Sequence, residues 1–215
     1  MPSCALSRRD PPNGKIGISN NKGFTVIEML IVVAVLAIIT SLALPSYRAL
    51  LEKRRVTSGS EQISAFLSSA QMESVKRNQF VAVNLEYNDG AWCLGMRDDD
   101  TPDVSCDCTI EDTGNAQACV LDSSGVSELR VMRSSGVNYP ELLASTSGLG
   151  GDDNNLVFDP VRGLIVDDET AGIELISPDQ ETYALNIGLT PTGRVSICSD
   201  GGRTIYSVPG YEECP

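Results

Sequence analysis

The sequence contains no histidine, and this absence removes the commonest general base of enzyme active sites. Without histidine, neither a Ser-His-Asp nor a Cys-His arrangement can form. Glycine-rich loops of the P-loop or Rossmann type are also missing. Acidic residues are numerous in the predicted loops, so they do not single out one catalytic pair. We therefore expect neither enzymatic activity nor a cofactor.

Aromatic residues and positive charges are scarce as well. Phe, Trp and Tyr make up 5% of the 215 residues, so a core must rest on Val, Ile and Leu. Sixteen basic residues stand against 29 acidic ones, which gives a net charge of -13. Nucleic-acid binders need positive surface to contact phosphates, so this balance argues against a general nucleic-acid binder.

Long apolar runs are absent except for one, the segment 23–47. Between Lys22 and Arg48 only Glu28 carries a charge. A helix needs about 20 apolar residues to cross a bilayer, and this run is long enough. The remainder of the chain is polar and rich in turn residues, which is typical of one anchor followed by one modest domain.

The residues at the start of this run carry a family resemblance. Residues 22–28 are Lys-Gly-Phe-Thr-Val-Ile-Glu, with the glycine, the phenylalanine and the glutamate in register before the apolar run. This segment resembles the processing site of type IV prepilins and type II secretion pseudopilins. The resemblance implies that a prepilin peptidase cuts between Gly23 and Phe24 and methylates the new amino terminus of Phe24. Glu28 then becomes the fifth residue of the mature chain.

Glu28 and Pro45 each have a simple and a functional interpretation. An unpaired carboxylate is costly inside an apolar span, although Glu28 lies close enough to the start to reach the headgroups. The resemblance implies instead a partner in the filament, the amino terminus of a neighbouring Phe24. Pro45 falls where pilins often carry a helix-breaking proline. It is either tolerated in the span or releases hydrogen bonds on assembly, and the sequence leaves both open.

The sequence predicts four segments. They are a prepilin leader at 1–23, a transmembrane or filament-core part of a helix at 24–47, an amphipathic part of the same helix at 48–79, and a β-rich periplasmic domain at 80–215. The helix is expected to end near Arg77. Its apolar face is predicted from residues at helical spacing: Ile63, Phe66, Leu67, Ala70 and Val75.

Strand patterns follow the predicted helix. Segments 80–85 and 91–96 predict a hairpin around Asn88-Asp89-Gly90. Further strands are expected at 128–133, 155–158, 163–166, 172–176, 182–187 and 194–198, whereas the acidic segment 97–127 shows no clear pattern. The predicted fold class is α+β, a long N-terminal helix packed on a C-terminal antiparallel β domain. Segments 129–131, 156–164 and 192–198 resemble the GspH/FimT family of minor pilins and pseudopilins, which implies a pilin-like fold.

Seven cysteines are present, and Cys4 leaves with the predicted leader. The remaining six lie beyond the span, so disulfides in an oxidising compartment are expected. Cys198 is predicted to pair with Cys214 and so to clip the tail. The pairing of the other four stays open: Cys93, Cys106, Cys108 and Cys119. No metal site is expected, because the cysteine spacing matches no zinc pattern and the acidic clusters lack EF-hand spacing.

These observations predict a structural subunit, a minor pilin of the initiation or tip complex of a type IV pilus. The alternatives are minor pseudopilin H of a type II secretion system and a DNA-binding competence pilin. The resemblance to FimT-like members that bind DNA implies a glycine-arginine pair with a second basic residue two positions further on. Gly193 and Arg194 supply the pair, but Ser196 stands where the second basic residue is expected, and the tail is acidic. Nucleic acid is therefore not an expected partner. The expected partners are prepilin peptidase, other pilins or pseudopilins, and inner-membrane lipid.

A single pass through the bacterial inner membrane is expected, with the amino terminus in the cytoplasm and the C-terminal domain in the periplasm. Basic residues do not decide this orientation, because four lie in the leader and four lie in the first twenty residues after Tyr47. The orientation follows from the processing motif and from the cysteines.

Overall fold

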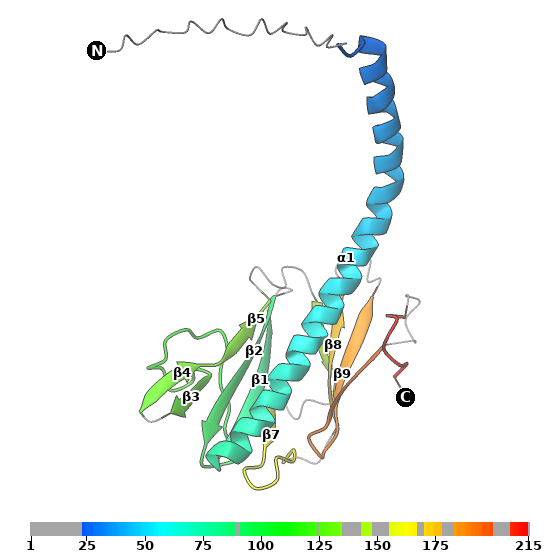
Figure 1. Cartoon of the computed structure of the whole chain (residues 1–215). Coiled ribbons are helices and arrows are strands. Elements are labelled where there is room, and N and C mark those ends of the chain that lie inside the picture. Colours follow the sequence, from blue (N-terminus) through cyan, green and yellow to red (C-terminus); the bar gives the residue numbers. More distant parts are fainter. Residues whose placement is uncertain are drawn as a thin grey trace, which may run out of the picture. The chain divides into compact units, whose positions relative to one another are not determined.

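The structure is a computed structural model that describes residues 23–88, 91–123, 125–134, 143–147, 155–166, 170–177, 183–199 and 207–214. The chain divides into two units, Met1–Leu44 and Pro45–Pro215. One helix, α1 (Val26–Arg77), begins in the first unit and ends in the second (Figure 1). Antiparallel strands follow α1 in the second unit, which confirms the predicted α+β class.

The helix α1 ends at Arg77 because the next residue leaves the helical conformation. Asn78 has a φ of 54°, a left-handed conformation that asparagine tolerates better than most residues. The Gln79 amide then donates to the Ser74 carbonyl at 3.3 Å, the bond expected of a Schellman cap. Lys76 and Arg77 in the last turn complement the negative end of the helix dipole.

The first sheet has the antiparallel strand order β5-β2-β1-β7. Its strands are β1 (Phe80–Asn88), β2 (Ala91–Asp99), β5 (Val131–Arg133) and β7 (Asn155–Phe158). The predicted hairpin is confirmed, because β1 and β2 pair along their whole length up to Asn88 and Ala91. The two turn residues, Asp89 and Gly90, lie outside the described residues.

The second sheet has the antiparallel order β10-β9-β8-β6. Its strands are β6 (Leu143–Ser147), β8 (Ala171–Ile176), β9 (Ala184–Leu189) and β10 (Val195–Ser199). A two-stranded ribbon is formed by β3 (Val120–Ser123) and β4 (Val126–Leu129). The sequence does not predict β3 or β6, because both are short and half polar.

Two predicted strands are wrong. The segment 128–133 is not one strand, because the chain changes partner at Arg130: β4 pairs with β3, whereas β5 pairs with β2. The Arg130 amide donates to the Cys119 carbonyl, and the Arg130 carbonyl accepts from Met96. The segment 163–166 is not a strand either. It contains the turn residue Gly163 and only one isolated bridge, from Ile165 to Phe158.

One face of α1 in the second unit packs against both sheets (Figure 1). Ile63 and Leu67 are completely buried there, and burial of such a side chain contributes about 1.5–3 kcal/mol. The predicted face is correct at these positions but wrong at Val75, which is 49% exposed. The helical repeat instead brings Ser74 to the buried side. Ile63 and Leu67 belong to the hydrophobic core of the second unit. This core also includes residues of the helix and both sheets: Val56, Ala70, Val83, Leu94, Ile173 and Leu185.

Gln71 of α1 contacts two turns, one after β7 at Gly163 and one between β9 and β10 at Gly193. The Gln71 side-chain amide donates to the Gly163 carbonyl at 2.8 Å. Gly163 and Gly193 have φ values of 65° and 75°, which favour glycine. A Cβ atom on Gly193 would lie 2.2 Å from Gln71 Nε2 and 2.6 Å from the Gly163 oxygen. Both the backbone conformation and the close approach therefore require glycine at position 193.

Charged side chains tie the last turn of α1 to β2. Arg77 Nε donates to Glu73 Oε2 at 2.6 Å, and Arg77 Nη1 donates to Asp98 Oδ2 at 3.1 Å. The hydrogen bonds that Lys76 and Arg77 donate to the Glu73 carboxylate lower the pKa of Glu73 below its ordinary value. Because Glu73 and Arg77 are mostly buried, this cluster contributes more than an exposed ion pair would.

The domain is expected to lose stability as the pH falls below about 4.5, the ordinary pKa of Glu73. The folded pKa is lowered, so the unfolded state binds more protons in this range, and the stability present at neutral pH is lost as Glu73 becomes protonated. Urea-unfolding midpoints of the detergent-solubilised chain should fall more steeply for wild type than for Glu73→Gln. The difference should be about 1 kcal/mol.

The matched control is Glu128→Gln, which removes an exposed ion pair with Arg130. Its acid dependence should follow that of wild type. Parallel pH profiles for wild type and Glu73→Gln would contradict the assignment.

Candidate functional site

The first functional region is the start of α1. Thr25 precedes the helix, and its side-chain oxygen accepts a hydrogen bond from the Glu28 amide at 3.3 Å. Its carbonyl accepts from the Met29 amide at 3.2 Å, so Thr25 is the N-cap residue. Thr25 and Glu28 have the spacing of a capping box, and the Glu28 carboxylate lies at the positive end of the helix dipole. Glu28 thus has a favourable local setting that the sequence prediction missed.

Gly23 and Phe24 lie immediately before this cap. Phe24 is 77% exposed, and a Cβ atom added to Gly23 would meet no atom within 4 Å. Both residues at the predicted cut are therefore accessible, and a side chain at position 23 disturbs no contact of the described residues. The leader residues 1–22, including Cys4, lie outside the described part of the chain.

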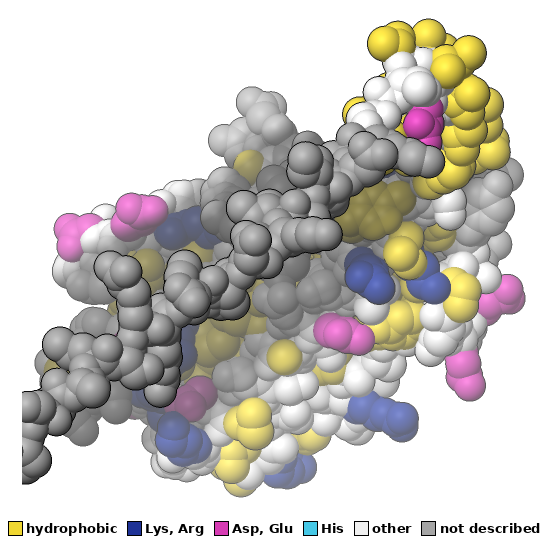
Figure 2. All heavy atoms as spheres, turned by 45° about the horizontal axis from the view of Figure 1, so that its top comes forward, with side chains coloured by type: hydrophobic (Ala, Val, Ile, Leu, Met, Phe, Trp, Pro, Cys, Tyr) yellow, Lys and Arg dark blue, Asp and Glu magenta, His cyan; other side chains and the backbone are white. Residues whose placement is uncertain are grey.

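The first part of α1 exposes a continuous apolar surface. Hydrophobic side chains gather on it in Figure 2, and each large one is about half exposed or more. This helix is long and apolar enough to cross a membrane, and none of its most apolar stretch is buried. The exposed side chains include Ile27, Leu30, Val33, Leu36, Ile39 and Leu42. Such a surface needs lipid or protein to cover it.

Pro45 lies inside α1, which continues through it without an end. Proline removes one backbone donor, so the helix lacks a hydrogen bond at this point. The side chain of Pro45 is outside the described atoms. Its role in assembly stays a prediction.

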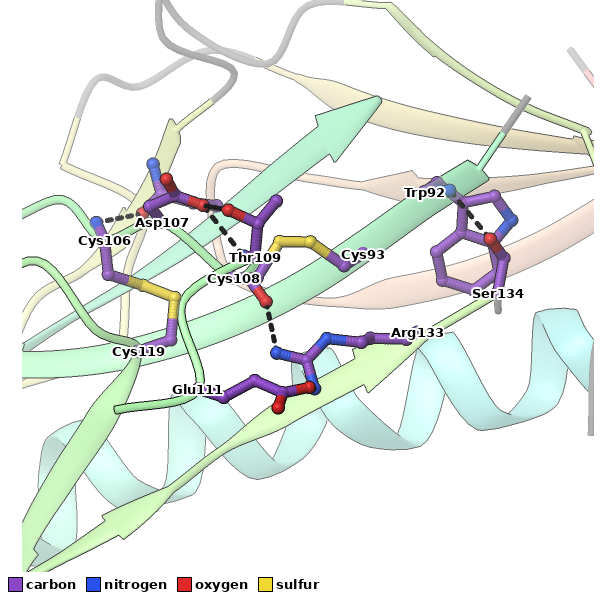
Figure 3. Close-up of a disulfide and its surroundings, with 11 residues drawn as sticks. Trp92, Cys93, Cys106, Asp107, Cys108, Thr109, Glu111, Cys119, Arg133 and Ser134 are labelled. Atoms are coloured by element: carbon purple, nitrogen blue, oxygen red, sulfur yellow. Dashed lines mark hydrogen bonds and ion pairs between the residues drawn. A yellow bond between two sulfur atoms is a disulfide. The ribbon is translucent and has the colours of Figure 1, made fainter. Parts of the chain in front are cut away.

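The second region is a pair of disulfides beside β2 (Figure 3). Cys93 is bonded to Cys108 and Cys106 to Cys119, so the two bridges interlace along the chain. These four cysteines form one buried cluster, which the sequence left without an assigned pairing. The Cys108 carbonyl accepts from Arg133 Nη2 at 2.8 Å, and Arg133 also pairs with Glu111 at 3.2 Å.

Gly95 provides the space for these disulfides. A Cβ atom at this position of β2 would lie 2.2 Å from the Cys119 sulfur and 2.9 Å from Cys108 Cβ. Both disulfides therefore pack directly against the backbone of β2 at Gly95. The sequence pattern of β2 contains no indication of this requirement, because it depends on a contact between distant segments.

The acidic segment between β2 and β3 is organised by local hydrogen bonds. Side-chain oxygens of Asp99, Asp107, Asp112 and Asn115 each accept from the backbone amide two residues later. Such turns are typical of Asp and Asn in irregular segments. Within the described residues no group of three or more His, Cys, Asp or Glu could hold a metal ion. Two further acidic clusters of the sequence, at 152–153 and 167–169, lie outside the described residues.

The third region is the C-terminal tail. The structure joins Cys198 of β10 to Cys214, the pairing expected from the sequence. The Ser199 amide also donates to the Glu212 carbonyl at 2.7 Å. The Tyr211 hydroxyl donates to the Glu61 carboxylate on α1 at 3.0 Å. Burial, together with this hydrogen bond, raises the pKa of Tyr211 above its ordinary value, so the hydroxyl keeps its proton at neutral pH.

The residues considered for DNA binding lie in and near the turn between β9 and β10. Arg194 is exposed, whereas Gly193 is buried against Gln71. Ser196, at the position of the second expected basic residue, contacts the Gly188 carbonyl at 3.4 Å. Arg203 lies outside the described residues. Of the described positions Gly193, Arg194 and Ser196, only Arg194 is basic, so these three do not form a cluster of positive charge.

Family comparisons agree with this arrangement. Residues 18–44 match the prokaryotic N-terminal methylation motif, and residues 59–205 match the type II transport protein GspH. A processing motif, an exposed apolar helix and an antiparallel β domain define a pilin-like structural subunit, not an enzyme. The second match covers more than half of the 215 residues, and the chain belongs to the GspH family.

Individual relatives come from Pseudomonas aeruginosa. Two fimbrial proteins are 28% identical to this chain over 99 residues, which is 46% of this chain and 64% of their own length. The chain thus spans just under two thirds of the curated relatives it matches. A crystal structure of the type IV minor pilin FimU is 15% identical, with a TM-score of 0.40, and covers 66% of this chain and 90% of its own. A second crystal form of FimU gives 14% identity and a TM-score of 0.42.

Proposed function

We propose that this chain is a minor pilin that is cut after Gly23, methylated at Phe24 and assembled into the initiation or tip complex of a type IV pilus. Prepilin peptidase and other pilins are its partners. The observation that carries the proposal is the accessible Gly23-Phe24 pair directly before a capped helix whose apolar surface is uncovered. The cut creates an amino terminus next to Glu28, so that each subunit carries both members of an ion pair.

Before assembly, the exposed part of α1 is held in the inner membrane, with the amino terminus in the cytoplasm. Disulfides form in oxidising compartments, and three in the second unit support a periplasmic location for that unit. In the filament, the apolar surface of α1 is covered by the helices of neighbouring subunits instead of lipid. The same surface thus serves both states, because each supplies an apolar environment.

A type II secretion system is the second candidate, in which the chain acts as its minor pseudopilin H. The family description favours secretion, whereas the curated relatives are fimbrial proteins. Both machines need the same exposed helix and processing motif.

Replacing Gly23 by leucine is expected to leave the full-length precursor in the membrane. A leucine side chain at position 23 meets no atom of the described fold within 4 Å of its Cβ, so a defect reports on the peptidase. Immunoblotting of membranes measures the size of the product, and a mature-sized band would contradict the predicted cut. Gly125→Leu is the control: its Cβ also meets no atom within 4 Å, its left-handed φ of 82° strains the chain only locally between β3 and β4, and it should be processed normally. Loss of surface pili with normal secretion would identify a pilus subunit, and the reverse would identify a pseudopilin.

A further inference from the structure

A groove lies beside α1 just beyond its apolar part. It has a volume of about 460 Å³ and is formed by successive turns of the helix and by two residues of the C-terminal tail, Pro209 and Tyr211. The Cys198–Cys214 disulfide and the hydrogen bond from Tyr211 to Glu61 hold the tail against the helix. The helix contributes the remaining lining residues: Leu50, Lys53, Arg54, Thr57, Ser58 and Glu61.

The chemistry of this groove is cationic and apolar. Lys53 and Arg54 supply two positive charges, and Leu50 is 44% exposed at the end of the groove that lies nearest the apolar run in the sequence. Glu61 is the one carboxylate among the lining residues, and it accepts the hydrogen bond of Tyr211. In a chain with a net charge of -13, this local excess of positive charge stands out.

The position along the helix matches the headgroup layer of a membrane. Leu50 and Arg54 lie three and seven residues beyond Tyr47, where the apolar run ends. At 1.5 Å per residue this is roughly 5–10 Å along the axis. The headgroup layer on one side of a bilayer is about 5–8 Å thick. Lysine and arginine side chains are long enough to place their charges at phosphates within this layer.

We propose that the groove binds the headgroup of an anionic phospholipid in the leaflet from which the domain projects. Lys53 and Arg54 contact the phosphate, and Leu50 lies against the glycerol and the first acyl carbons. The proposal rests on the membrane-held state of the proposed function and adds a specific lipid ligand to it. Bound lipid would hold the base of the domain at the membrane until the subunit leaves for the filament.

The test uses the full chain in nanodiscs that contain phosphatidylcholine and phosphatidylglycerol in equal amounts. Native mass spectrometry of the released protein counts the lipids of each kind that stay bound. Two cations near an anionic headgroup predict a preference for phosphatidylglycerol of roughly tenfold or more. The double variant Lys53→Gln/Arg54→Gln should lose this preference.

Two further variants make the result specific. Arg162→Gln/Arg194→Gln removes the same charge from exposed positions outside the groove and should keep the preference. Lys53→Arg/Arg54→Lys keeps both charges and should keep it too, which excludes misfolding as the cause of a loss. Equal binding of both lipids to wild type, or an equal loss in the control variant, would overturn the proposal.

A partner subunit is the other possible occupant. If Lys53→Gln/Arg54→Gln keeps its lipid preference but no longer co-purifies with other pilins, the groove is a subunit contact and the lipid proposal fails. Processing after Gly23 is measured separately, so failure of the lipid proposal does not depend on failure of the proposed function.

Discussion

Replacing Glu28 by glutamine is expected to remove the chain from filaments while leaving membrane insertion and processing intact. The proposed partner of Glu28 is the amino terminus of a neighbouring Phe24, within the apolar core of the filament. Removing one member of a buried ion pair costs roughly 3–5 kcal/mol, because the other charge stays buried without a partner. Incorporation into filaments should therefore fall by at least about a hundredfold.

Glutamine is the informative substitution because it preserves the start of the helix. The Glu28 backbone amide bonds to Thr25, and glutamine is as suitable as glutamate at this position of a capping box. The variant thus changes the charge and little else. Quantitative immunoblotting of sheared filaments and of membranes measures how much of the subunit is in filaments and how much stays in the membrane.

Glu128→Gln on β4 is a matched control that makes the same chemical change at an exposed position of the domain. Its partition should stay close to that of wild type. Normal filament content in Glu28→Gln would leave only the simpler interpretation, a carboxylate that reaches the headgroups.

Gly193→Ala is expected to lower the folding stability of the domain by about 2–5 kcal/mol. The left-handed backbone at Gly193 costs an L-residue about 1–2 kcal/mol. The added methyl group would also lie 2.6 Å from the Gly163 carbonyl oxygen, which is backbone and cannot swing aside. Overpacking of this kind typically costs a further 1–3 kcal/mol.

Gly125→Ala separates these two contributions. Gly125 has a φ of 82°, but a Cβ atom there meets nothing within 4 Å, so this variant shows the backbone cost alone. Urea unfolding of the detergent-solubilised chain should place Gly193→Ala clearly below Gly125→Ala. Equal midpoints for the two variants would show that the contact of Gly193 with Gln71 and Gly163 accommodates a methyl group without loss of folding stability.

The class of this protein was readable from local patterns. An apolar run of this length with one carboxylate and a Gly-Phe pair before it does not depend on any distant contact, so the sequence predicted the helix and the processing site. The β1–β2 hairpin followed from alternation and an Asp-Gly turn. The break between β4 and β5 at Arg130 was not predicted. The two strands pair with different neighbours, and strand pairing depends on which distant segment lies beside each strand in the fold.

The functional regions show the same difference between features set by local sequence and features set by contacts between distant segments. Glu28 was identified because charge inside an apolar span is expensive wherever it occurs. The interlaced disulfides were not assigned, because six cysteines allow many pairings and the choice depends on which cysteines the folded chain brings together. The groove at Lys53 and Arg54 was missed for a similar reason, since Tyr211, which forms its other wall, lies 150 residues after Glu61 in the chain.

By itself, the sequence predicted a long apolar helix behind a prepilin motif, followed by a disulfide-bearing β domain. Hydrophobicity, charge and chain stiffness act over a few residues, so the linear order carries that information. The tertiary structure decided which glycines are indispensable, which cysteines pair and where the tail lies against α1. Those features depend on the exclusion of volume and on contacts between distant segments, which exist only after the chain has folded.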